Sequence, residues 1–243
     1  MWPESVYLGA LERLPAAWRL LPEKVSALKN ATVAFNAFHE PQRGAYFNAF
    51  WLAEPGKAAA AVYSKSHLVP FGEYVPAGFR WFINAMGIPM ADQQPGALPG
   101  GALMAGEDLR LSFAAEVCSE NMFGEELATW FAGEAPEVII NVANLGWFGA
   151  GAAAQFTAMS AMRARETARP VLQAVNNSHS ALILPDGSLG RIAEPDAQNL
   201  DVRAPRMTGA PTPFVRWGNA PALVLSAFML LAALLGAGSK RLP

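Results

Sequence analysis

The spacing of apolar residues over the first 210 positions predicts strands and helices in alternation. Apolar segments of strand length, separated by turn residues, are expected as strands at residues 31–38, 46–53, 58–65, 109–117, 137–143, 171–176, 181–184 and 189–192. Helices are expected at 119–132, where Ser119 would be the cap, and at 152–168. Strands that alternate with helices predict an α/β layered fold, and the hairpin-type turns predict a mixed sheet.

The most apolar part of the chain is residues 220–238, which carry no charge. A run of this length predicts a transmembrane helix, because about 20 apolar residues cross a bilayer. Lys240 and Arg241 follow the run and Arg216 precedes it, which favours a cytoplasmic C-terminus and a main domain on the outer side. The alternative is a buried core helix. We therefore expect one domain over residues 1–210, a linker at 211–219 and the membrane helix at 220–238.

Composition and charge exclude some classes of function. Hydrophobic residues make up 52% of the chain and charged residues 16%, and the formal net charge is −2. A basic surface for nucleic acid is therefore not expected. The histidines, at positions 39, 67 and 179, lack the spacing of metal ligands, so we predict no metal site.

The single cysteine, Cys118, stands where an apolar strand meets a predicted helix start. Helix N–H groups at such a position would stabilise a thiolate and a developing oxyanion, so we expect a reactive thiol with a lowered pKa. Taken alone, a cysteine here is more often a small buried apolar residue. The choice between these interpretations depends on the rest of the chain.

Two further segments change that balance. Residues 1–5 read MWPES, and residues 63–76 read YSKSHLVPFGEYVP. With the segment around Cys118, they resemble, in the same order, the Glu, Lys and Cys motifs of the nitrilase superfamily. The second segment is similar to the apolipoprotein N-acyltransferase branch. Residues 144–149, 162–170 and 176–177 and the terminal apolar run extend the resemblance over most of the chain.

The resemblance implies roles for individual residues. Cys118 would be the nucleophile, Glu4 the base that accepts its proton, and Lys65 the cation that stabilises the oxyanion. Glu73 would orient Lys65 and keep it charged. Glu120 would assist proton transfer, although an exposed glutamate in a first helical turn is nearly as good an interpretation.

The resemblance also implies a fold and a reaction. The fold would be a nitrilase-like α-β-β-α sandwich that lacks the family's first strand and helix, followed by one C-terminal transmembrane helix. The reaction would pass an acyl chain from a phospholipid, through a cysteine thioester, to the N-terminal amine of a diacylglyceryl-cysteine apolipoprotein. The implied place is the bacterial inner membrane, with the catalytic domain on the periplasmic side and without a cofactor.

Departures from the family keep two alternatives open. Ser119, Leu145 and Phe156 stand where the family commonly has an aromatic residue, an aspartate and a histidine. The alternatives are an amidase that uses water as acceptor, and a catalytically inactive fragment or paralogue.

The segment at residues 77–90 is rich in aromatic and aliphatic residues but lies between prolines and glycines. One interpretation is a loop that caps the core. The other is an arm at the membrane interface, where Trp81 and Phe82 would contact acyl chains.

Overall fold

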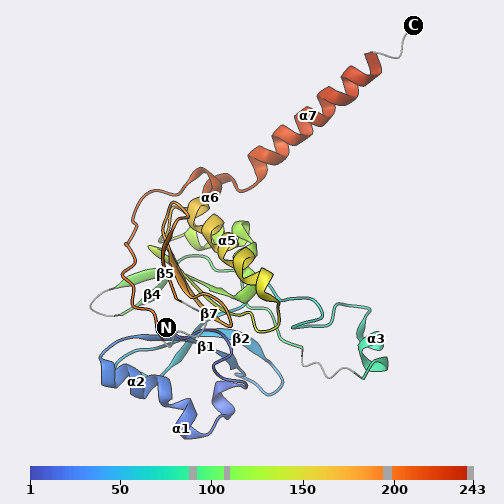
Figure 1. Ribbon diagram of the computed structural model, residues 1–243. Helices are drawn as coiled ribbons and strands as arrows, with labels where there is room; N and C mark the ends of the chain where they lie inside the picture. Colours follow the sequence, from blue (N-terminus) through green and yellow to red (C-terminus); the bar gives the residue numbers. More distant parts are fainter. Residues whose placement is uncertain (88–91, 107–109, 194–198, 240–243) are drawn as a thin grey trace.

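A computed structural model describes residues 1–87, 92–106, 110–193 and 199–239. Two β-sheets are stacked face to face, and helices cover their outer faces (Figure 1). The predicted α/β layering is therefore confirmed. Residue 109, the first of one predicted strand, lies outside the described residues.

The smaller sheet is antiparallel and consists of β1 (Val33–His39), β2 (Phe47–Ala53) and β3 (Ala60–Ser64) in that order. Strands β1 and β2 are buried along most of their length because both faces of this sheet are covered. Phe35 and Trp51 belong to an outer cluster against the N-terminal segment. Phe50 belongs to the core between the sheets, where its ring lies 5.8 Å from that of Phe113.

The larger sheet has the strand order β4-β5-β6-β7-β8-β9. Its strands are β4 (Leu103–Ala105), β5 (Leu111–Val117), β6 (Val138–Asn144), β7 (Val171–Asn176), β8 (Ala181–Ile183) and β9 (Leu189–Ile192). Strands β5, β6 and β7 are parallel and the other pairs are antiparallel, which confirms the predicted mixed sheet. The carboxyl ends of the parallel strands meet at one edge, and functional groups gather at such an edge.

The helices and 3-10 turns are η1 (Leu11–Arg13), α1 (Ala16–Arg19), α2 (Leu21–Lys29), α3 (Arg80–Ala85), η2 (Cys118–Met122), α4 (Gly124–Ala128), η3 (Thr129–Phe131), α5 (Ala150–Thr167), α6 (Pro213–Trp217) and α7 (Ala220–Ser239). Helix α2 packs on β1 and β2, and α5 packs on β7 and β8. The layers are thus helix, small sheet, large sheet, helix.

Two predicted segments differ from the structure. The helix expected at 119–132 is divided into η2, α4 and η3. The hydroxyl of Ser119 is buried and has no hydrogen-bond partner among the described residues, so it does not cap a helix. Tertiary contacts of Glu120, described below, hold the first turn in its tight form. The linker expected at 211–219 contains α6, which Thr212 caps by accepting a hydrogen bond from the N–H of Val215.

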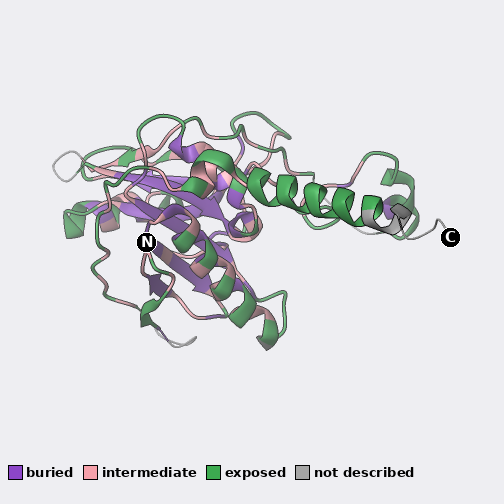
Figure 2. Cartoon of the chain, turned by 90° about the horizontal axis from the view of Figure 1, so that it is seen from above, coloured by how far each residue is buried: buried purple, intermediate pink, exposed green. Residues whose placement is uncertain are grey.

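Helix α7 extends away from the two sheets (Figure 1). Its large apolar side chains between Leu223 and Leu235 are exposed, as the burial colours of Figure 2 show. The alternative of a helix buried in the core is therefore wrong. None of the helices within the described residues has the length and hydropathy required of a membrane-crossing segment.

Candidate active site

Glu4 lies between the two sheets, although it is close to the start of the chain. The N–H of Trp2 donates to the carbonyl of Ala34 (2.8 Å), which holds the first residues beside β1. The buried Glu4 carboxylate accepts hydrogen bonds from the side-chain amide of Asn48 (2.9 Å) and the N–H of Asn144 (2.9 Å). Asn48 belongs to β2 and Asn144 ends β6, so Glu4 is fixed by both sheets.

The surroundings of Glu4 make its carboxyl a stronger base than an exposed glutamate. Burial is the largest cause that raises its pKa, because a low dielectric disfavours the charged form. The hydrogen bond from Asn48 and the charge of Lys65 oppose this effect and lower the pKa, and a hydrogen bond with Cys118 acts in the same direction. The raised pKa makes the carboxyl better able to accept a proton than an exposed glutamate.

Lys65 directly follows β3, and its side chain has no exposed surface. Its N–H donates to the carbonyl of Asn48 (2.8 Å), and its Nζ donates to Oε1 of Glu73 (2.8 Å). Burial is the largest single influence on the pKa of Lys65 and lowers it. The negative charges of Glu73, Cys118 and Glu4 and the hydrogen bond to Glu73 together outweigh burial, so the pKa is raised. Glu73 also accepts from the N–H of Val69 (2.7 Å), which fixes the carboxylate beside the Lys65 ammonium.

Cys118 stands at the carboxyl end of β5, in a turn that starts η2. Its φ of 55° lies in the left-handed region, which costs a non-glycine residue free energy and occurs often at functional sites. The thiol is near enough to Glu4 to share a hydrogen bond with it, and it is within electrostatic range of Lys65. The structure therefore brings Glu4, Lys65 and Cys118 together from segments far apart in the sequence.

The expected lowering of the thiol pKa is wrong. Burial, followed by the negative charge of Glu4, raises the pKa of Cys118 to about 12, and the charge of Lys65 only partly compensates. The helix N-terminus expected behind the thiol is a short 3-10 turn instead. The resting thiol therefore keeps its proton, and nucleophilic attack requires Glu4 to accept that proton during the reaction.

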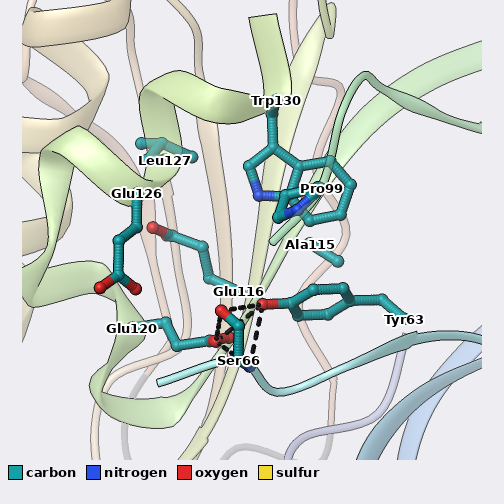
Figure 3. A pocket seen from close by; sticks show the side chains of 9 residues that line it. All are labelled: Tyr63, Ser66, Pro99, Ala115, Glu116, Glu120, Glu126, Leu127 and Trp130. Carbon is teal, nitrogen blue, oxygen red and sulfur yellow. Dashed lines mark hydrogen bonds between the residues drawn. The ribbon is translucent and has the colours of Figure 1, made fainter. Parts of the chain in front are cut away.

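Glu120 is buried, so its interpretation as an exposed first-turn residue is wrong. Its Oε1 accepts hydrogen bonds from the hydroxyl of Tyr63 (2.7 Å) and the N–H groups of Ser66 (2.8 Å) and His67 (3.2 Å). Its Oε2 accepts from the N–H of Val117 (2.8 Å). Figure 3 shows the Tyr63 and Ser66 side of this cluster. Glu120 thus joins the loop after β3 to the strand end that carries the nucleophile.

Trp81 and Phe82 lie on α3, which projects from the domain away from the two sheets (Figure 1). Trp81 is 70% exposed and Phe82 is 43% exposed. The interpretation of residues 77–90 as a loop capping the core is therefore wrong for this helix, although Ile83 is buried. Residues 88–90 of that segment lie outside the described residues.

Sequence reasoning missed the role of the asparagines that hold Glu4, although Asn144 and Asn176 lie in segments that resemble the family. Asn36 and Asn48 interrupt two otherwise apolar strands, and the Asn36 amide donates to Oδ1 of Asn48 (2.6 Å). Asn176, at the end of β7, donates to the backbone carbonyl of Glu4 (2.6 Å). An amide side chain in the middle of a buried strand was a usable signal, since buried polar groups require partners.

Comparisons with known proteins agree with this geometry. The family model described as carbon-nitrogen hydrolase matches residues 23–203. Proteins named apolipoprotein N-acyltransferase from Ralstonia nicotianae and Bordetella bronchiseptica are 37% and 39% identical over 96% and 70% of this chain. The chain spans only 44% and 32% of the lengths of these relatives.

Solved structures support the fold. An amidase from Nesterenkonia sp. has a TM-score of 0.57 at 15% identity and covers 89% of this chain and 74% of its own. A carbon-nitrogen hydrolase from Helicobacter pylori has a TM-score of 0.54 at 14% identity, with 70% of this chain and 61% of its own covered. At such identities the likeness shows a shared nitrilase-like fold.

Proposed function

The chain belongs to the carbon-nitrogen hydrolase family, and we propose that it carries the acyl-transfer site of an apolipoprotein N-acyltransferase. The observation that carries the proposal is the buried group of a thiol, a carboxyl and an ammonium that are coupled to one another. The similarity to N-acyltransferases over 96% of the chain supports the choice of acyl donor and acceptor.

The first half of the reaction would acylate Cys118. Glu4 accepts the thiol proton as Sγ attacks the ester carbonyl of a phospholipid, and Lys65 stabilises the oxyanion. The tetrahedral intermediate collapses with cleavage of the ester C–O bond. The leaving alkoxide takes the proton from Glu4 and departs as a lysophospholipid, which leaves a thioester on Cys118.

The second half would transfer the acyl chain to an amine. The N-terminal amine of a diacylglyceryl-cysteine apolipoprotein attacks the thioester carbonyl, and Glu4 removes a proton from the attacking nitrogen. Lys65 again stabilises the oxyanion. The C–S bond breaks, the thiolate of Cys118 recovers the proton from Glu4, and an N-acylated apolipoprotein leaves.

The exposed apolar surfaces support a membrane location. We propose that α7 and the arm formed by α3 contact the phospholipid bilayer, with the domain on the periplasmic side of the bacterial inner membrane. The exposed side chains of Trp81 and Phe82 would meet the interfacial region, where aromatic residues are favoured. An anchored site meets both the phospholipid donor and the lipoprotein acceptor on one surface. Deleting residues from Ala220 onward is expected to release the protein from washed membranes.

Mass spectrometry of the intact chain tests the proposed reaction. With phosphatidylethanolamine vesicles alone, the protein should gain the mass of one acyl chain, and adding a diacylglyceryl-cysteine peptide should remove it and yield N-acyl peptide. Cys118→Ala should abolish the adduct, and Lys65→Met should slow its formation by roughly 10²–10³-fold. The exposed Glu134→Gln variant is the matched control.

Two other outcomes of the mass-spectrometry experiment would favour the alternatives to acyl transfer. Loss of the adduct in water without an amine would favour the amidase that uses water as acceptor. Absence of any adduct in a folded protein would favour the inactive fragment or paralogue.

A further inference from the structure

A small pocket lies behind the nucleophile, between the loop that follows β3 and the short helices that follow Cys118 (Figure 3). Glu116 and Glu120, which lie two residues before and two residues after Cys118, line it together with Glu126. The pocket encloses about 10 Å³. That is roughly the room that one water molecule requires, provided that two to four polar groups surround it.

Three oxygens at this pocket have no hydrogen-bond partner among the described residues. Both carboxyl oxygens of Glu116 are buried without a hydrogen bond of good geometry, although the Asn141 side chain is close enough to lower the pKa of Glu116. Oε2 of Glu126 is buried without a partner too. Glu116 itself is 3% exposed. Figure 3 shows the Glu116 side chain beside Glu126, with no dashed line reaching it. Unpartnered buried oxygens are costly, so their presence at one cavity indicates a bound group.

We propose that one water molecule occupies this pocket and bridges a protonated Glu116 to Glu126, which makes Glu116 a positioning residue for the loop that carries Lys65. The Glu116 hydroxyl donates to the water, and the water donates to Oε2 of Glu126. This arrangement gives partners to two of the three buried oxygens with a single molecule.

The charges around Glu116 support its protonated form. The charged and titratable groups that face it are Tyr63 from β3, His67 from the following loop, Glu120 from η2, Glu126 from α4, and Arg163 and Glu166 from α5. Burial, followed by the negative charge of Glu120, raises the pKa of Glu116 to about 8, while Arg163 opposes the rise. At neutral pH the carboxyl therefore keeps its proton.

Two carboxylates next to Glu116 hold the loop after Lys65. Glu120 accepts from the N–H groups of Ser66 and His67, and Oε1 of Glu126 pairs with Nδ1 of His67 at 2.7 Å. A neutral Glu116 leaves these contacts undisturbed. An ionised Glu116 would repel both carboxylates and loosen the loop, because like charges in a buried site interact strongly. Loosening the loop would move Lys65 away from the thiol.

The inference rests on the proposed role of Lys65 beside Cys118, but its test requires no acyl transfer. Infrared spectra of the full chain should show the carbonyl band of a protonated carboxyl at pH 7. The band should vanish as the pH rises through about 8, and Glu116→Gln should lack it. A Glu116→Gln spectrum identical to that of the wild type would overturn the proposal.

Alkylation of the single cysteine by iodoacetamide supplies the functional readout. We expect the ratio of the Glu116→Gln rate to the wild-type rate to rise roughly tenfold from pH 7 to pH 9, because only the wild type gains a charge near the thiol. Glu116→Leu, a second neutral variant, should behave in the same way, and Glu134→Gln should follow the wild type. A constant ratio across this range would overturn the proposal. A rising ratio in a chain that forms no acyl adduct would support it and count against the proposed function.

Discussion

The ion pair between Lys65 and Glu73 offers the sharpest test of how the site is held together. Nζ and Oε1 are 2.8 Å apart, with side-chain exposures of 0% for Lys65 and 14% for Glu73. Removing one partner of a buried pair costs about 3–5 kcal/mol, because the other charge remains without compensation. Glu73→Gln keeps a carbonyl that accepts from Lys65, so we expect about 2–3 kcal/mol of lost stability at pH 7.

The stability that Glu73→Gln loses relative to the wild type should decrease at high pH. The folded-state pKa of Lys65 is raised above its unfolded value of about 10.4. At neutral pH the charged Lys65 therefore contributes its full stabilisation to the folded wild type. That contribution is lost as the pH rises through the folded-state pKa. Glu73→Gln removes the main cause of the raised pKa and leaves burial, which lowers it. The difference in unfolding free energy between the two proteins should therefore narrow above pH 10.

Urea unfolding followed by tryptophan fluorescence, in one detergent for all variants, measures these differences. The control is Glu54→Gln, because Glu54 forms a pair of the same 2.8 Å length with the more exposed Lys57. We expect the control to cost less than about 1 kcal/mol, as surface pairs usually do. Equal costs for the two variants, or a difference that does not change with pH, would refute the reasoning.

Three further predictions concern single residues. Cys118→Gly should be about 0.5–1 kcal/mol more stable to urea than Cys118→Ala, because φ is 55° there, and equal stabilities would argue against strain. Asn48→Ala should raise the pKa of Glu4 further, since its amide hydrogen bond lowers that pKa; an unchanged carboxyl titration by NMR would contradict this. Arg169→Met should cost about 2–4 kcal/mol in urea unfolding, because the buried guanidinium donates to three backbone carbonyls. Exposed Arg165→Met should change stability by less than about 0.5 kcal/mol.

Local sequence patterns determined most of the strands. The segments around Phe35 and Phe50 are nearly continuous apolar runs of strand length, and the structure has β1 and β2 within two residues of the predicted limits. The apolar run that ends before Cys118 likewise predicted β5 and the turn that presents the thiol. These predictions succeeded because a strand covered on both faces imposes its pattern on consecutive residues. The N-terminal helices α1 and α2 were missed, since their segments are short and interrupted by prolines.

The motifs also identified Glu4, Lys65, Glu73 and Cys118 as site candidates, through their resemblance to a family. These motifs did not determine whether the Cys118 thiol is protonated at rest. Whether the thiol pKa falls or rises depends on how deeply it is buried and on which charge is nearer, and both follow from the way the two sheets stack.

Only the tertiary structure decided the roles of the other acidic residues. Glu116 and Glu120 stand in similar sequence surroundings. Within the described part of the chain, the carboxyl of Glu116 has no hydrogen bond of good geometry, whereas that of Glu120 accepts several. The contacts of Glu120 also replaced a predicted long helix with a tight 3-10 turn at Cys118. The contacts of Glu120 with Tyr63 and Ser66 join residues more than 50 positions apart, so no local pattern contains them. Their energies exceed the small helix propensities of a single sequence segment.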